Sequence, residues 1–346
     1  MKTNKKPNIL IIYTGGTIGM IENPKTHALE PFDFNHLLQN VPKIRMLDFG
    51  VDHYEFSYPL DSSDMNTAHW ADIAHVIQDH YDKYDGFVVL HGTDTMAYTA
   101  SALSFMLENL NKPVIITGSQ LPIGEVRTDG EENLIAALQI AASQDENDGG
   151  PMVREVAILF DNDLLRGNRS TKHSSDHFKA FKSNNYPHLA DIGLRITFHP
   201  SSLWRPEVEK PLEVHTDMDS NVIYLDLFPG ISRSTVEHIL HTPGLKGVIL
   251  KTFGAGNGPT GEWFQSLLKD AIERGIVVVN VTQCVEGSVM PHRYETGMAM
   301  SESGVVPGHD LTSEAAITKL MYLFGRGLNS QEVKLAMELS IRGELS

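Results

Sequence analysis

The feature that most constrains this fold is a repeated unit in which a short apolar run ends in a small polar turn and a helix-like segment follows. The first run, residues 9–12, reads Ile-Leu-Ile-Ile and leads into the turn TGGTIG. A continuous apolar run of this length is typical of a strand buried on both faces. Because such runs alternate with helical segments, the pattern predicts a largely parallel sheet covered by helices on both faces.

The unit recurs in two blocks of the chain. The expected strands are residues 9–12, 87–90, 114–116 and 156–160 in the first block, and 222–228, 247–253 and 276–281 in the second. The expected helices are residues 67–84 (capped by Asn66 or Thr67), 96–110, 133–142, 232–241, 263–274, 312–324 and 330–341. A weak alternation at residues 54–58 is the only other extended signal in the first 60 residues.

The two blocks predict two domains. Periodicity fades over residues 198–219, which carry three prolines and many charges. We therefore expect a larger, mostly parallel, flavodoxin-like α/β domain at residues 1–196, which would be catalytic. A linker at 197–220 and a smaller Rossmann-like α/β domain at 221–346 would follow.

Composition excludes several classes of function. The chain has 346 residues and a net charge of −16, which argues against nucleic-acid and anionic-membrane partners. Its single cysteine, Cys284, cannot form an intrachain disulfide and fits a reducing compartment. The apolar run near the N-terminus is too short for a signal peptide, and no stretch is long enough to span a membrane. The expected location is the cytoplasm.

The turn after the first strand is the first candidate for chemistry. Gly15 and Gly16 permit backbone angles and close approaches that a side chain would block. In an open α/β sheet, ligands bind beyond the carboxyl ends of the strands, so Thr17 would stand at the mouth of such a site. A plain strand-to-loop turn is the alternative. The polar segment 20–31 would be either a loop that closes over the site or a connection without function.

Hydroxyls follow other expected strands as well. Thr93 and Ser119 lie beside glycines, and a further loop supplies Ser62 and Ser63. A threonine hydroxyl is a poor nucleophile unless a base acts on it, directly or through another hydroxyl. Asp94 and Lys172 are the available partners, and free backbone N–H groups near the glycines could hold an oxyanion. This set suits attack on an amide or ester carbonyl.

These residues carry a family resemblance. The segments TGGTIG (14–19) and HGTDTMAYTASALSF (91–105) resemble the two signature segments of the L-asparaginases, most closely the cytoplasmic type I branch. Four further segments match in the same order: DSSDM (61–65), TGSQLP (117–122), RGNRSTK (166–172) and NVTQC (280–284). The resemblance implies hydrolysis of L-asparagine to L-aspartate and ammonia through an acyl-enzyme, with no cofactor and no metal.

The resemblance also implies residue roles. Thr17 matches the nucleophile, while Thr93, Asp94 and Lys172 match the second catalytic group. Asp94 also matches the residue that holds the substrate's α-amino group, and Ser62 the one that receives its α-carboxylate. The full expected substrate-binding set is Gly16, Asp61, Ser62, Ser63, Asp94, Ser119 and, from a neighbouring subunit, Asn257. The smaller domain would complete a neighbour's site, which implies a homodimer or a homotetramer built as a dimer of dimers.

The chain departs from the family pattern at two places. Relatives place a tyrosine in the loop that covers the nucleophile, whereas residues 20–31 contain none. Tyr294 could serve instead, or it could be only an interface residue. Some cytoplasmic members bind asparagine at a regulatory site, which Thr171 and Cys284 match here. Lys251 stands where an arginine is expected and cannot grip a carboxylate with two parallel hydrogen bonds.

Other interpretations are weaker. Residues 256–261 fit G-x-G-x-x-G, but the next expected strand does not end in the acidic residue that a dinucleotide fold needs. His173 and His177 are four residues apart without further metal-ligand partners, and Cys284 is expected to be a small buried residue. A binding-only amino-acid sensor would not need Thr17 or Lys172. An ammonia-supplying amidotransferase subunit would be expected to carry an added N-terminal domain.

Overall fold

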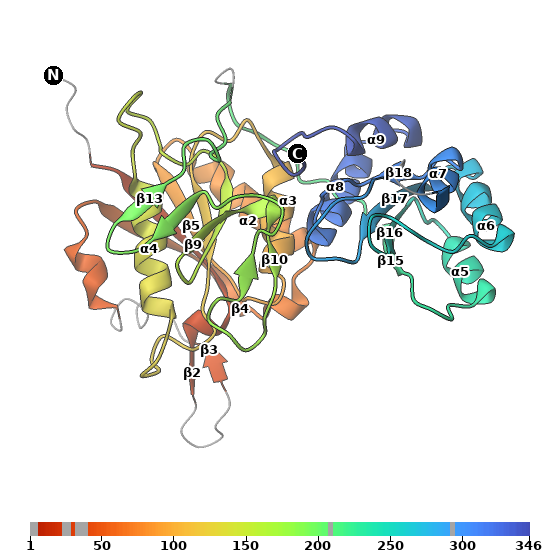
Figure 1. Ribbon diagram of the computed structural model, residues 1–346. Helices are drawn as coiled ribbons and strands as arrows, with labels where there is room; N and C mark the ends of the chain where they lie inside the picture. The colour runs from red at the N-terminus through yellow and green to blue at the C-terminus, as the bar shows by residue number, and fades with distance from the viewer. Residues whose placement is uncertain (1–5, 23–28, 32–40, 207–209, 291–294) are drawn as a thin grey trace. The chain divides into compact units, whose positions relative to one another are not determined.

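The computed structural model describes residues 6–22, 29–31, 41–206, 210–290 and 295–346. The chain divides into two compact units between Val214 and His215 (Figure 1). This division falls inside the stretch 197–220 that the sequence predicts as a linker. The first unit extends further than expected, because strands β13 (Ile196–Phe198) and β14 (Glu213–Val214) both pair with strands of that unit.

The first unit is built on an eight-stranded sheet in the order β13-β12-β9-β8-β7-β5-β1-β4. From β4 to β8 all neighbours are parallel, whereas β9, β12 and β13 are each antiparallel to the strand beside them. The strands not yet bounded are β1 (Asn8–Gly15), β4 (Gly50–Leu60), β5 (Gly86–Leu90), β7 (Val114–Thr117), β8 (Val156–Phe160), β9 (Asp163–Arg166) and β12 (Ala190–Ile192).

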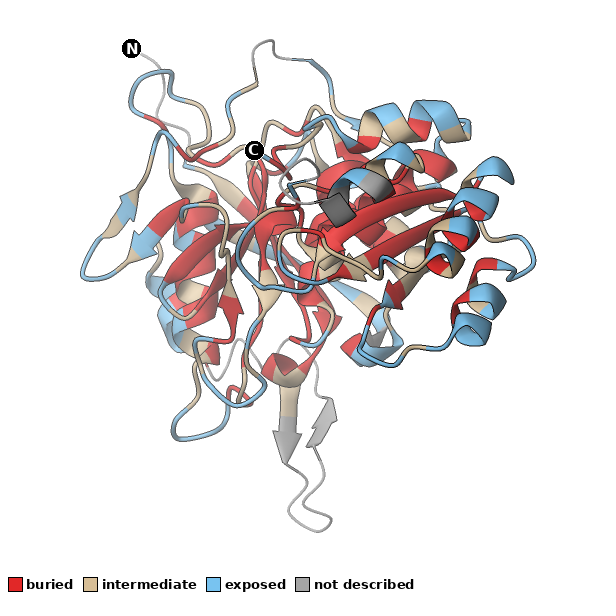
Figure 2. Ribbon diagram, turned by 45° about the vertical axis from the view of Figure 1, so that its right-hand side comes forward, coloured by how far each residue is buried: buried red, intermediate tan, exposed pale blue. Residues whose placement is uncertain are grey.

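The helices described beside this sheet are α2 (Thr67–His80), α3 (Met96–Met106) and α4 (Gly130–Ala142). The Asn66 side chain caps α2, since its oxygen accepts hydrogen bonds from two N–H groups of the first turn. Alternate residues of β1, such as Ile9 and Ile11, pack in one core with Leu134 and Leu138 of α4. Figure 2 shows the central strands buried while the helices turn exposed faces outward.

Shorter elements complete the unit. They are the paired strands β2 (Met20–Glu22) with β3 (Leu29–Pro31), β6 (Leu107–Glu108) with β14, and β10 (Thr171–Lys172) with β11 (Phe181–Lys182). The 3-10 turns in the described part of this unit are η1 (Thr17–Gly19), η2 (Pro42–Met46), η3 (Ser62–Asp64) and η4 (Gly167–Arg169). The expected loop at 20–31 thus has strands at both ends, and its residues 23–28 lie outside the described part of the chain.

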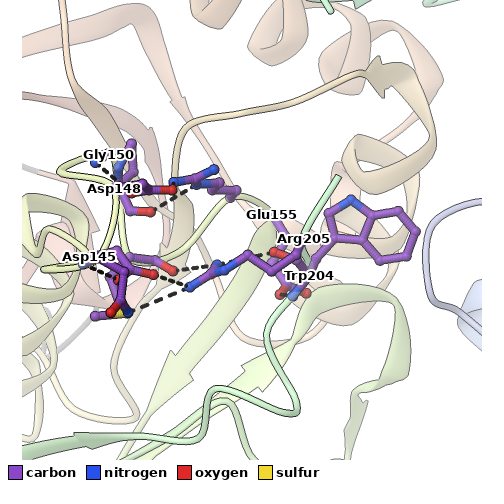
Figure 3. A network of polar contacts seen from close by, with 10 residues as sticks. Asp145, Asp148, Gly150, Glu155, Trp204 and Arg205 are labelled. Atoms are coloured by element: carbon purple, nitrogen blue, oxygen red, sulfur yellow. Dashed lines mark hydrogen bonds and ion pairs between the residues drawn. The ribbon is translucent and has the colours of Figure 1, made fainter. Parts of the chain in front are cut away.

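A polar network holds the segment between α4 and β8 (Figure 3). Arg205 donates to Asp145 at 3.0 Å and to the Met152 carbonyl at 2.9 Å. Beside it, Glu155 accepts hydrogen bonds from the Trp204 N–H and from Arg166 Nε, each at 2.6 Å. The Arg166 and Glu155 side chains are only 5% and 9% exposed, so this ion pair fixes the end of β9 from inside the protein.

The second unit contains a parallel sheet in the order β15-β16-β17-β18. Its strands are β15 (Val222–Asp226), β16 (Gly247–Thr252), β17 (Val277–Thr282) and β18 (Val306–Pro307), and its helices are α5 (Arg233–Leu240), α6 (Glu262–Glu273), α7 (Glu295–Glu302), α8 (Ser313–Gly325) and α9 (Ser330–Met337). Helices α5 and α6 share a hydrophobic core with the strands, for example through Leu240 and Phe264.

The C-terminal segment is anchored to α8 by a fully buried ion pair. Lys319 Nζ lies 2.6 Å from Glu344 Oε1, and neither side chain is exposed. Lys319 also donates to the Met337 carbonyl at 3.2 Å, while Glu344 accepts from the N–H groups of Ile341 and Arg342. A buried charge is costly unless its hydrogen-bonding groups have partners. Here the opposite charge and the neighbouring backbone groups together supply partners for both side chains.

The predicted α/β fold class is confirmed, and the differences are local. Helix α3 ends at Met106, four residues early, because Leu107 and Glu108 pair with β14 instead. Tyr84 lies beyond the end of α2, and α9 stops at Met337 rather than 341. Among the described helices, none combines the length and apolar character needed to cross a membrane.

Candidate active site

Four neighbouring strands deliver the candidate residues to one edge of the first sheet. Strands β4, β1, β5 and β7 are adjacent and parallel, so their carboxyl ends lie at the same edge. The loops that follow them carry Asp61–Ser63, Gly16–Thr17, Thr93–Asp94 and Ser119, in that order. The sequence places hydroxyls at strand ends, and the sheet order places those strand ends side by side.

Two glycines bring the loops after β1 and β5 into direct contact. Gly16 has φ +88°, a conformation that residues with a Cβ rarely adopt. A Cβ placed on Gly16 would lie 2.5 Å from the Gly92 nitrogen and 2.6 Å from its Cα, which is too close for any side chain. Thr17 and Thr93 each follow one of these glycines, so both stand on loops that touch backbone to backbone.

The turn that carries Thr17 is short, and a hydrogen bond from Tyr13 stabilises it. Thr17 is half-buried and opens the 3-10 turn η1, which the Gly19 N–H closes by donating to the Gly16 carbonyl. The buried Tyr13 hydroxyl donates to the Gly19 carbonyl at 3.0 Å. Burial, followed by the charge of Glu55, raises the pKa of Tyr13, so this hydroxyl keeps its proton and remains a donor.

The loop after β4 joins the same contact. A Cβ on Gly92 would lie 2.5 Å from Ser62 Oγ, and Ser62 is 5% exposed. The Thr95 hydroxyl donates to the Ser62 carbonyl at 2.7 Å. The Asp61 carboxylate accepts from the backbone N–H and the hydroxyl of Ser63, both at 2.9 Å, and thereby caps η3. Gly92 is therefore the point at which three loops meet.

Lys172 connects the second pair of candidate residues. Its Nζ lies 2.9 Å from Thr93 Oγ1 and 2.6 Å from Asp94 Oδ1, across 79 and 78 residues of sequence. The Lys172 side chain is 20% exposed and that of Asp94 is 66% exposed. Because an ammonium group only donates, the Thr93 oxygen accepts from it, and the Thr93 hydroxyl proton points elsewhere. Thr93 therefore lies between Gln120 and a lysine that Asp94 holds by an ion pair.

The loop after β7 contributes a residue that the sequence reasoning did not single out. Gln120 Oε1 lies 3.4 Å from Thr93 Oγ1, and its Nε2 donates to the His177 carbonyl at 3.0 Å. The only sequence signal for Gln120 is its place in the TGSQLP segment. The buried Ser119 hydroxyl donates to the Leu121 carbonyl at 2.6 Å, so it is engaged within its own loop.

The candidates of the second unit lie near the carboxyl ends of β16 and β17. Asn257 closes a tight turn, in which its backbone bridges to Phe253. Lys251 forms an ion pair with Asp226 of β15 at 3.1 Å. Cys284 is exposed, so the expectation that it is buried was wrong: it lies two residues past the end of β17, where the chain leaves the sheet. Tyr294 lies outside the described residues, and Thr171 stands next to Lys172 on β10 of the first unit.

The histidines singled out earlier make no joint site in the described structure. His173 Nε2 contacts Lys182 Nζ at 3.0 Å, while His177 uses its backbone in a local turn. Asp163, His188 and Asp191 do bring possible ligand atoms within 4.8 Å of one another. Lys179 already forms an ion pair with Asp163 at 2.7 Å, so a cation of the protein occupies this cluster.

The fold and this arrangement define a two-domain α/β enzyme whose polar groups suit acyl transfer to a hydroxyl. Two family models match the chain: the N-terminal asparaginase domain over residues 8–203 and the glutaminase/asparaginase C-terminal domain over residues 221–337. The chain therefore belongs to the asparaginase family.

The chain is also similar to individual proteins. L-asparaginase 1 of Escherichia coli K12 is 44% identical over 99% of both chains. A mouse protein named 60 kDa lysophospholipase is 41% identical over 98% of this chain and 62% of its own. The crystal structure of L-asparaginase I from Vibrio cholerae superposes with a TM-score of 0.89 at 41% identity and covers 99% of both chains.

Proposed function

We propose that this enzyme hydrolyses L-asparagine to L-aspartate and ammonia through an ester formed on Thr17. The observation that carries the proposal is the Lys172 amine, which lies within hydrogen-bond distance of both Thr93 and Asp94 on the loop that touches Gly16. The L-asparaginase names of full-length relatives support this choice of substrate.

In the first half-reaction, the Thr17 oxygen attacks the side-chain amide carbon of asparagine. Free backbone N–H groups at the glycine-rich turns stabilise the oxyanion. Thr93 delivers a proton to the amide nitrogen and is resupplied through Lys172, which Asp94 holds in place. The bond from the Thr17 oxygen to carbon forms and the carbon–nitrogen bond breaks. The Thr17 proton enters the Thr93–Lys172 relay and replaces the proton that Thr93 gave to the nitrogen, so ammonia leaves and the relay ends unchanged.

In the second half-reaction, water attacks the ester carbon. One water proton returns to the Thr17 oxygen as the ester bond breaks, and the remaining hydroxyl completes the aspartate carboxyl group. The same Thr93–Lys172 pair is placed to carry this proton, because microscopic reversibility favours one relay in both directions. No cofactor or metal is needed for either half.

The substrate's other groups would be held at the rim of this crevice. Asp94 is largely exposed and can receive the α-ammonium group, while Ser62, with Gly16, Asp61, Ser63 and Ser119 around it, would bind the α-carboxylate. In a homodimer or homotetramer, Asn257 and Tyr294 of a neighbouring subunit would complete the site. Thr171, Lys251 and Cys284 are proposed for a regulatory asparagine site. The single cysteine supports a cytoplasmic enzyme, because disulfides are rare in that compartment.

The direct test is ammonia release from asparagine and glutamine by the purified protein. Thr17→Val keeps the shape of the side chain and removes the hydroxyl, whereas Thr17→Ser is the matched variant that keeps it. We expect no turnover from Thr17→Val, measurable turnover from Thr17→Ser, and an aspartyl group on Thr17 by mass spectrometry with a slow substrate. A folded wild-type protein that binds asparagine and releases no ammonia would instead identify a sensor.

Light scattering tests the shared site. An active enzyme that is strictly monomeric at assay concentrations would contradict the proposed contribution of Asn257 and Tyr294 from a neighbour. Fractionation of the source cells, with activity found in the membrane or secreted fraction, would contradict the cytoplasmic location.

A further inference from the structure

A continuous chain of buried hydrogen bonds ends at the residue before Thr93. The Trp70 indole N–H donates to Thr99 Oγ1 at 2.9 Å, and Thr99 Oγ1 lies 2.9 Å from His91 Nε2. The other ring nitrogen, His91 Nδ1, lies 2.7 Å from the Gly92 carbonyl oxygen. His91 and Thr99 are completely buried and Trp70 is 7% exposed. The chain thus runs from α2 through α3 to the loop after β5.

The chemistry of the four groups fixes the direction of every bond. A carbonyl oxygen only accepts, so His91 Nδ1 must carry the hydrogen. Burial lowers the pKa of His91 to about 4, which leaves Nε2 as an acceptor at neutral pH. The Thr99 hydroxyl therefore donates to Nε2, and its oxygen accepts from Trp70, which can only donate. Trp70 and Thr99 together select the Nδ1–H form of the ring.

This ring holds one peptide plane of the candidate site. The Gly92 carbonyl and the Thr93 N–H belong to the same planar peptide and point in opposite directions. When His91 draws the carbonyl toward the core, the Thr93 N–H is aimed the other way. Within the described part of the chain, that N–H has no hydrogen-bond acceptor. Gly92 itself is closely packed, because Gly16 approaches its nitrogen and Cα and the Ser62 side chain lies where a Cβ of Gly92 would stand.

We propose that His91 is a positioning residue for the hydrolysis proposed above, acting through the Gly92 carbonyl to aim the Thr93 N–H and hydroxyl at the substrate. It does not touch the substrate or exchange protons with it. Trp70 and Thr99 act on His91 rather than on Gly92, because their hydrogen bonds keep the ring in the tautomer that donates to the Gly92 carbonyl. The inference rests on the proposed function, since it names what aligns Thr93 for that reaction.

Two matched pairs of variants test it. The amide nitrogen of Asn can take the place of Nδ1–H, so His91→Asn should keep kcat within about threefold of wild type. The amide of Gln reaches the place of Nε2 and leaves Gly92 without a donor. Thr99→Val removes the hydroxyl that selects the tautomer, while Thr99→Ser keeps it. We expect kcat to fall by about 10- to 100-fold in His91→Gln and Thr99→Val with KM changed by less than about threefold, since a misplacement of about 1 Å costs roughly 10²-fold.

Nitrogen NMR of the protein with ¹⁵N-labelled histidine gives a readout independent of activity. The His91 signals, assigned by their absence in His91→Asn, should show a neutral ring with hydrogen on Nδ1 from pH 5 to pH 8. In Thr99→Val this preference should weaken, and in Thr99→Ser it should persist. A ring with hydrogen on Nε2, or a charged ring at neutral pH, would overturn the inference even if a variant fails to fold.

The outcomes separate the two proposals. If the wild-type protein releases no ammonia, the proposed function fails. If the wild type is active and folded His91→Gln and Thr99→Val retain its kcat, the hydrolysis stands and the positioning role of His91 is refuted. A loss confined to KM would also refute it, because the site would then be binding substrate poorly rather than aligning Thr93.

Discussion

The close approach of Gly16 to Gly92 predicts the outcome of adding a single methyl group. In Gly16→Ala the new Cβ would begin 2.5 Å from the Gly92 nitrogen, whereas ordinary contact starts at 3.4 Å. The two loops must therefore separate by about 0.9 Å. Since a misplacement of about 1 Å at a catalytic centre costs roughly 10²-fold, we expect kcat to fall by about that factor.

Backbone strain adds a second and separable effect. At φ +88° and ψ 169° the backbone lies in a region essentially restricted to glycine, so an alanine there costs about 1–3 kcal/mol and lowers the free energy of unfolding by that amount. Gly327 offers the matched control, because it has φ +75° and no atom within 4 Å of its would-be Cβ. Gly327→Ala should lose stability through its positive φ alone, with unchanged kcat.

Urea unfolding followed by circular dichroism measures the strain, and initial rates of ammonia release measure the alignment. Both variants should lose stability, Gly16→Ala more because its Cβ also meets the Gly92 backbone, while only Gly16→Ala should lose activity. Wild-type kcat in Gly16→Ala, or an equal loss of kcat in Gly327→Ala, would refute the argument that the two loops must touch.

Three further outcomes follow from the described contacts. Lys172→Met should lower kcat by about 10²- to 10⁴-fold, whereas Lys182→Met on the paired strand β11 should leave it unchanged in the same ammonia assay. Glu155→Gln should lower the free energy of unfolding by about 3 kcal/mol, because it leaves the Arg166 charge buried without its partner; a change below about 1 kcal/mol in urea titrations would contradict this. The pKa of His91 is about 4 in the folded protein and 6.5 in the unfolded chain. The neutral, buried ring therefore contributes fully to the free energy of unfolding above pH 6.5, and this contribution is lost as the pH falls toward 4. The stability difference between wild type and His91→Asn should therefore shift by about 3 kcal/mol over that interval, and a difference that stays constant with pH would show that the ring is not held neutral.

The parts of the fold that could be predicted from sequence are those whose signal is local. Strands such as β1 and β5 are buried on both faces, so their residues form continuous apolar runs. Strand β4 was largely missed because it lies at the sheet edge and has one neighbour. Asp52, His53 and Glu55 on this strand are exposed, which blurs any alternation.

In the candidate site, too, some features follow from local sequence patterns and others depend on individual long-range contacts. The meeting of the loops could be inferred, because parallel strands end at one edge of a sheet. The contact between Lys172 and Thr93 could not be read from periodicity, because 79 residues separate them and Lys172 lies on a two-residue strand. The positions of Gln120 and His91 depend on individual hydrogen bonds, and the exposure of Cys284 depends on where the chain leaves β17.

The buried pair of Lys319 and Glu344 has a practical consequence for anyone who shortens or extends this chain. Glu344 stands two residues before Ser346, yet it neutralises an ammonium group inside α8's packing. Removing residues 344–346 would leave the Lys319 ammonium group buried without its carboxylate partner, which would destabilise the smaller unit. A carboxypeptidase or a truncation that removes Glu344 therefore acts on the buried core of the smaller unit.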